Sequence, residues 1–141
     1  MTLGWALLAA SLWQTAAVPP APSVRTVEKG ALSDLSTARQ ATVTDRDAWV
    51  TLWRAHAPAR PLPEVDFARE MVVAVFLGTR PTAGFGVEIV GVRGEVGALV
   101  VQYRETRPSR DALTAQVLTA PYHLAAIPKR PGTVTFEKLT P

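Results

Sequence analysis

The sequence predicts an α+β domain, mainly an antiparallel β-sheet with one tryptophan-bearing helix packed on it. Three observations lead to this class. The stretch 67–78 contains a continuous apolar run of seven residues, 71–77, which has the length and the β-branched composition of a buried strand. A stretch at 44–56 repeats its apolar residues at helical spacing and carries two tryptophans. The other apolar segments are short and separated by glycine or proline, as strands and turns are. A β-sandwich with a peripheral helix is the alternative arrangement of these elements.

The length and composition of the chain indicate one globular domain. Its 141 residues are enough to bury a sizeable core without a covalent staple. The net charge of +3 is modest, and the basic residues are scattered along the chain, so we expect no nucleic-acid partner. There is no cysteine, which excludes disulfides, thiolate metal sites and a cysteine nucleophile. We expect no small-molecule cofactor and no metal.

The N-terminus has the pattern of a signal peptide. Residues 1–24 carry no charged side chain, and the apolar stretch 3–13 is followed by the small residues Thr15, Ala16 and Ala17. The basic residue that usually precedes the apolar region is missing. A membrane anchor is the alternative, but Leu3 to Val18 is interrupted by Gln14 and is shorter than the roughly 20 residues of a spanning helix.

This pattern divides the chain into three predicted parts. We predict a signal peptide at 1–17, a proline-rich linker at 18–23 and a single β-rich domain at 24–141. The protein is then exported, either periplasmic or secreted. Association with the cell envelope remains open, with membrane contact only through an uncleaved N-terminal segment.

The first elements of the domain are two short strands and a helix. Strands are expected at 24–29 and 39–43. Thr44 is expected to cap the helix, with Asp45 and Asp47 in its first turn, and Pro58 to end it. The predicted apolar stripe consists of Ala48, Trp49, Leu52, Trp53 and His56. We interpret Trp49 and Trp53 as core residues, the alternative being a platform for carbohydrate or peptide.

The run at 67–78 is the predicted central strand. Asp66 and Phe67 stand at its entrance and Gly78 at its exit. Because strand residues alternate between faces, Met71, Val73, Val75 and Leu77 form one apolar surface, and Val72, Ala74 and Phe76 form the other. Both faces therefore need covering, as in a central strand. A buried helix is the competing interpretation of the same run.

A hairpin is predicted after the central strand. The sequence is nearly palindromic about Gly94, and a turn there places Val92 opposite Val96 and Ile89 opposite Leu99. In this register Phe85 lies beside Tyr103. We expect the hairpin to extend the sheet.

A charged loop and two strands complete the domain. The loop at 104–111 contains Arg104, Arg107 and Arg110, and we interpret it as solvated, with internal pairing to Glu105 and Asp111. The segment 116–129 is predicted to be a strand that Pro121 and Pro128 either confine to an edge or bend at those points. A last alternating strand is expected at 133–138.

No catalytic motif is present in the sequence. The two histidines, His56 and His123, lie outside any recognised ligand spacing or nucleophile elbow. A hydrolase that uses His123 with Asp66 or Tyr122 is the least favoured hypothesis, and we expect that the protein is not an enzyme.

From about Trp49 onward, the order of landmarks resembles the C-terminal domain of the PrcB family of protease-complex subunits. These landmarks are the tryptophan-bearing helix, Asp66-Phe67, the central strand, the turn 83–89, the strand 99–101, the segment 119–129 and Val134-Thr135-Phe136. The chain departs from the family in lacking a cysteine for lipidation. Its turn also reads Ala-Gly-Phe, where the family commonly has Gly-Gly-Tyr.

The resemblance implies a non-catalytic, exported protein that associates with a subtilisin-type serine protease and stabilises it. An inhibitor of such a protease, acting through the loop at 104–111, is the alternative. The resemblance supplies no catalytic residues. From the predicted hairpin register we expect the protein contact at Gly84, Phe85, Arg104, Arg107 and Arg110.

Overall fold

The computed structural model describes residues 23–141, so the predicted signal peptide and all but the last residue of the predicted linker lie outside the described part. The described chain contains seven strands and one helix. They are β1 (Arg25–Gly30), β2 (Arg39–Val43), α1 (Arg46–His56), β3 (Glu70–Phe76), β4 (Gly86–Glu95), β5 (Ala98–Thr106), β6 (Tyr122–Pro128) and β7 (Thr133–Lys138). The α+β class is confirmed.

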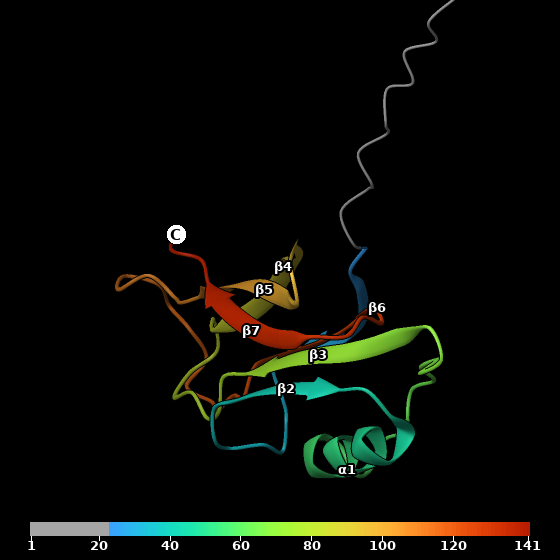
Figure 1. The fold of residues 1–141 in the computed structure, drawn as a ribbon. Helices are drawn as coiled ribbons and strands as arrows, with labels where there is room; N and C mark the ends of the chain where they lie inside the picture. The colour runs from blue at the N-terminus through green and yellow to red at the C-terminus, as the bar shows by residue number, and fades with distance from the viewer. Residues whose placement is uncertain (1–22) are drawn as a thin grey trace, which may run out of the picture.

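The strands form two sheets that share one core. An antiparallel sheet has the order β1-β6-β3-β2, and a second sheet has the order β4-β5-β7, in which β5 and β7 run parallel. Figure 1 shows three layers, with α1 below the first sheet and the second sheet above it. The predicted helix-covered sheet and the alternative sandwich are therefore both present. The hairpin β4-β5 covers the sheet that it was expected to extend.

β3 is the central strand, as predicted. It pairs with β2 on one side and β6 on the other. Met71, Val73, Val75 and Leu77 face the second sheet, whereas Val72, Ala74 and Phe76 face α1. Alternation along seven apolar residues thus supplies two separate cores, because each face has its own covering layer.

α1 begins and ends close to the predicted bounds, with one correction at its start. Asp45, and not Thr44, is the N-cap, because its side chain accepts a hydrogen bond of 2.8 Å from the Ala48 amide. Ala48 is exposed, unlike the rest of the predicted stripe. Trp49 and Trp53 are buried, and their indole N–H groups donate to the carbonyls of Pro63 and Arg60 at 3.0 Å each.

The predicted hairpin register is wrong. Val96 and Gly97 form the turn, because Glu95 pairs with Ala98 and Gly97 adopts a φ of 69°. Gly94 lies within β4, paired with Leu99. A further register shift between Ile89 and Gly91 places Ile89 opposite Tyr103, and Phe85 lies before the strand.

β6 is a central strand and not an edge, which corrects the second prediction about this region. It pairs with β1 and β3. Pro121 precedes the strand and Pro128 is its last residue, so neither removes a donor from the middle of the ladder. The Pro121 carbonyl instead accepts a hydrogen bond of 2.9 Å from the Leu77 amide. The strand begins at Tyr122, so residues 116–121 lie outside it.

The entrance to β3 is a hydrogen-bonded turn built on Asp66. Its carbonyl accepts from the amides of Arg69 and Glu70, and its carboxylate accepts from the amide of Ala68 at 3.1 Å. Phe67 packs against the core on the helix side. Over residues 23–141, no helix has the length and hydropathy of a membrane span.

Candidate interaction surface

The turn between β3 and β4 lies against the loop between β5 and β6. Arg80 and Thr119 exchange two backbone hydrogen bonds of 2.7 and 2.9 Å, and the Ala83 amide donates to the Ala115 carbonyl at 3.0 Å. Gly84 has a φ of 93°, and a Cβ there would lie 2.9 Å from the side chain of Pro108. The structure thus brings the glycine turn and the loop at 107–121 together, although not through the pairing of Phe85 with Tyr103 from which we expected it.

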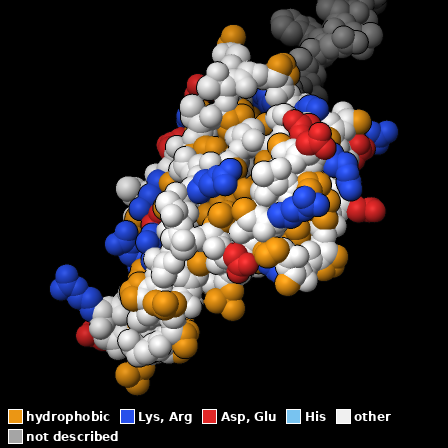
Figure 2. Space-filling view, turned by 90° about the horizontal axis from the view of Figure 1, so that it is seen from below, with side chains coloured by type: hydrophobic (Ala, Val, Ile, Leu, Met, Phe, Trp, Pro, Cys, Tyr) orange, Lys and Arg blue, Asp and Glu red, His pale blue; other side chains and the backbone are white. Residues whose placement is uncertain are grey.

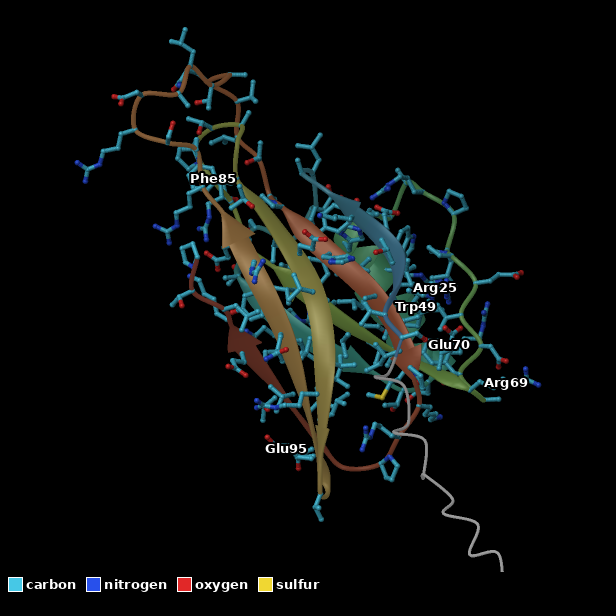
Figure 3. All side chains as sticks on the ribbon, turned by 90° about the horizontal axis from the view of Figure 1, so that it is seen from above. Arg25, Trp49, Arg69, Glu70, Phe85 and Glu95 are labelled. Atoms are coloured by element: carbon cyan, nitrogen blue, oxygen red, sulfur yellow. The ribbon has the colours of Figure 1, made fainter. Side chains whose placement is uncertain are left out.

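The β5–β6 loop (residues 107–121) projects from the body of the molecule. Figure 3 shows it at the upper left, with Phe85 at its base and Glu95 at the opposite end of β4. Figure 2 shows the same region as a lobe at the lower left that carries hydrophobic and basic side chains. Phe85 is half-buried at this base, with the guanidinium carbon of Arg80 5.8 Å from its ring centroid.

The three arginines predicted for the contact are exposed and spread along the loop side of the second sheet. Arg104 lies opposite Glu88 in the β4-β5 ladder. Arg107 lies 3.9 Å from Glu105, whose carboxylate is closer to Lys138 at 3.1 Å. Arg110 makes no ion pair within residues 23–141. Surface pairs of this kind contribute at most about 1 kcal/mol, so these guanidinium groups stay available to a partner.

Three exposed apolar residues of the β5–β6 loop were not predicted as part of the site. Leu113 is fully exposed, and Val117 and Leu118 keep 54% and 70% of their surface exposed. The sequence signal was the uncharged stretch 112–119, of which residues 116–119 were interpreted as the start of an edge strand. Exposed apolar side chains gathered on one projecting loop are typical of a protein contact surface.

His123, the catalytic residue of the hydrolase hypothesis, is buried, and both of its ring nitrogens have hydrogen-bond partners. The Ile89 amide donates to its Nδ1 at 2.7 Å, so Nε2 carries the proton and faces the Thr26 hydroxyl at 2.9 Å. Burial, together with the nearby charge of Lys29, lowers the pKa of His123 to about 4. Neither Asp66 nor Tyr122 contacts this ring, because Tyr122 points to the opposite face of β6 and Asp66 caps its own turn.

His56 belongs to a partly buried polar cluster that sequence reasoning missed. Its Nδ1 lies 2.8 Å from the Ser33 hydroxyl and its Nε2 lies 3.5 Å from the Glu28 carboxylate. The Glu28 carboxylate accepts hydrogen bonds from the Tyr122 hydroxyl and pairs with the Arg60 guanidinium. The cluster joins β1, α1, the segment after α1 and β6.

The charges of this cluster balance one another. Burial tends to raise the pKa of Glu28, but the hydrogen bonds from Tyr122 and Arg60 outweigh it, and the net shift is downward. Burial lowers the pKa of His56 despite the neighbouring Glu28. At neutral pH the cluster therefore pairs a Glu28 carboxylate with the Arg60 guanidinium beside a neutral imidazole.

Ser33, His56 and Glu28 have the residue types of a hydrolytic triad, but the surrounding amides are committed elsewhere. The Ser33 amide donates to the Ala120 carbonyl at 3.0 Å, and the Asp34 amide donates to the His56 carbonyl at 2.9 Å. The Leu35 amide donates to the Ser33 hydroxyl at 3.1 Å. These three amides are therefore not free to stabilise an oxyanion, and the contacts of the cluster are those of a structural network.

Within residues 23–141 the acidic and histidine side chains form no group of three that is suited to hold a metal ion. The β5–β6 loop and the turn beside it are the part of the described surface where exposed apolar and basic side chains occur together on a projecting segment.

The fold and this surface define a small β-sandwich with a covering helix and a projecting, partly apolar loop. Residues 71–128, from β3 through the end of β6, match the family model described as PrcB C-terminal. The recognised resemblance is confirmed over this segment. Neither the curated proteins nor the solved structures yield a match to the chain.

Proposed function

We propose that this protein is an exported, non-catalytic accessory subunit that associates with a subtilisin-type serine protease and stabilises it. The observation that carries the proposal is the PrcB C-terminal match over residues 71–128, since the family comprises protease-complex subunits. The segment that matches includes the β5–β6 loop, whose exposed Leu113, Val117 and Leu118 suit a protein contact.

The engagement of the histidines supports a non-catalytic role. Both ring nitrogens of His123 are used by core partners, and the amides around Ser33 donate to other groups. A general base has to reach the proton that it abstracts, and a buried, fully bonded imidazole is poorly placed for that.

Affinity capture tests the association. The tagged protein is expressed in its own host, recovered from the periplasm or the culture supernatant, and its co-purifying proteins are identified by mass spectrometry. We expect a serine protease whose half-life falls when the gene for this protein is deleted and recovers on its return. Repeated recovery of this protein alone, with an unchanged protease half-life, would contradict the proposal.

Inhibition of such a protease is the second candidate function, because the β5–β6 loop projects from the domain and is exposed, as a segment that enters a protease cleft must be. Adding the purified protein at micromolar concentration to a subtilisin-type enzyme distinguishes the two functions. An accessory subunit leaves peptide hydrolysis unchanged or faster, whereas an inhibitor slows it.

Export is tested separately by N-terminal sequencing of the recovered protein. We expect Val18 or a neighbouring residue at the N-terminus, because small residues precede it. An intact Met1 would argue for a retained N-terminal segment.

A further inference from the structure

Residues 113–118, which we call the open segment, are paired along one side only. The Ala115 carbonyl accepts from the Ala83 amide, and Thr119 exchanges two hydrogen bonds with Arg80. The Ala115 carbonyl and the backbone groups of Thr119, four residues apart, bond to residues 80–83 and so face the same side, which fits the two-residue alternation of an extended chain. The backbone groups of Thr114, Gln116 and Leu118 therefore point to the opposite side.

On that opposite side no backbone group of the described chain pairs with the open segment, and the Thr114 carbonyl accepts only a long hydrogen bond of 3.4 Å from the Gln116 side chain. Within residues 23–141, none of the amides of 113–118 donates a backbone hydrogen bond. Further along the same side, Ala120 is paired, because its amide donates to Ala31 and its carbonyl accepts from Ser33. The outward edge of the open segment therefore adjoins the edge at which Ala120 pairs with Ala31 and Ser33. It lies beyond the last of these pairs.

The side chains of the open segment do not protect this edge. Proteins commonly block an exposed edge with charged residues, proline or a bulge. Residues 112–119 contain no charged residue and no proline, and Leu113 and Val117 lie two steps of the alternation apart on one face. An exposed edge with these properties is suited to bind an added strand.

The charges next to the open segment indicate what kind of strand fits. Arg107 and Arg110 precede it and Asp111 lies between them and the segment, which leaves an excess of positive charge at its N-terminal end. Glu105, the carboxylate nearest to Arg107, is shared with Lys138. In antiparallel pairing this end meets the C-terminal end of the added strand.

We propose that the open segment binds, by antiparallel strand addition, an extended segment of a partner protein that has apolar residues at alternate positions and Asp or Glu at its C-terminal end. The inference rests on the proposed function and deepens it, because it places the contact with the protease on this edge. The main chain supplies the pairing, the apolar residues fill the face of Leu113 and Val117, and the acidic end meets the two arginines.

A random dodecapeptide library displayed on phage tests this proposal with the immobilised, full mature protein. We expect enrichment of peptides with alternating apolar residues followed by Asp or Glu. Gln116→Pro removes an outward amide and should weaken binding of a selected peptide about five- to tenfold, the effect of losing one backbone hydrogen bond. Ala115→Pro is the matched control, since its amide points inward, and should change binding less than about threefold.

Two further measurements keep the test independent of folding. Thermal unfolding of both proline variants establishes that they keep the native fold. Arg107→Glu with Arg110→Glu lies outside the paired residues and should weaken binding of the acidic peptides while leaving unfolding unchanged, with a smaller effect at high salt.

The outcomes separate the inference from the proposed function. If Gln116→Pro captures and stabilises the protease as the unaltered protein does, the inference is wrong and the function stands. If peptides of the expected pattern are selected but no protease is captured, the proposed function fails and the strand-addition site stands. Absence of enrichment, or equal binding to both proline variants, overturns the inference. So does a dimer in sedimentation that Gln116→Pro abolishes, because the occupant is then a second copy.

Discussion

His123 should make the stability of this protein fall steeply as the pH is lowered from 7 to 4. In the folded protein its pKa is about 4, whereas the unfolded value is 6.5. The unfolded state therefore binds a proton first, and stability rises with pH across this interval. The contribution of the neutral imidazole is complete above pH 6.5 and is lost as the pH falls through 4.

The size of the effect follows from the difference between the two values. Each pKa unit corresponds to about 1.4 kcal/mol, so the shift of His123 removes about 3 kcal/mol between pH 6.5 and 4. The charged groups nearest to the ring are Lys29, which disfavours its protonation, and Glu88, which favours it. Because a domain of this size is stable by roughly 5–15 kcal/mol, a loss of this size is readily measured.

Urea unfolding at pH 7, 6, 5 and 4, followed by the fluorescence of the buried Trp49 and Trp53, measures this dependence. His123→Asn is the comparison, because its side-chain oxygen can accept the hydrogen bond from the Ile89 amide but does not titrate. The variant should be less stable at pH 7 and should lose about 3 kcal/mol less between pH 7 and 4. Equal pH dependence in the two proteins would refute the assignment to His123. The pH dependence that both proteins share would then be attributed to His56 and Glu28.

Three further predictions concern stability. Val73→Asp, at a fully buried position of β3, should abolish folding because it buries an unpaired charge, whereas Val73→Ala should leave a folded protein that is weakened by about 2–3 kcal/mol, both judged by circular dichroism. Gly78→Ala should cost more than about 2 kcal/mol in urea unfolding, because φ is 74° and the new Cβ would lie 2.7 Å from the Ala38 amide nitrogen; an unchanged midpoint would contradict this. Tyr122→Phe should cost about 1–3 kcal/mol because the Glu28 carboxylate loses a donor, and in a Glu28→Gln background the cost should shrink; equal costs in both backgrounds would disprove the coupling.

The central strand was predictable because its signal is local. The seven successive apolar residues 71–77 are enough to indicate that both faces of β3 are covered. Asp66 precedes the strand and Gly78 follows it. Which elements cover the two faces depends on contacts between residues that are far apart in the sequence. The hairpin was therefore placed beside this strand, although it lies over it.

The hairpin register was mispredicted because the sequence offers several glycines at the turn. Symmetry about Gly94 matches apolar residues in pairs, but it does not say which glycine takes a positive φ. Gly97 does so in the structure, and the additional register shift before Gly91 is invisible to a pairing scheme with a strict period of two.

The open segment and the polar cluster were missed for different reasons. Val117 and Leu118 have the local pattern of a strand and were predicted as one, but in the described chain they lack a pairing neighbour on one side and are exposed. Glu28 and Tyr122 are 94 residues apart, so their contact depends on the pairing of β1 with β6, which no local pattern specifies.

The cluster and the open segment also depend on different parts of the chain. The β5–β6 loop, which contains the open segment, is anchored by pairs inside residues 71–128, Gly86 with Thr106 and Arg80 with Thr119. In the cluster, Glu28, Ser33, His56 and Arg60 all lie outside that range, and Tyr122 alone lies within it. The segment that carries the family match therefore contains the proposed contact together with its local supports, whereas the preceding elements contribute by covering β3 and β6. A change in the cluster should then act on stability first, and on partner binding only as far as the folded population falls.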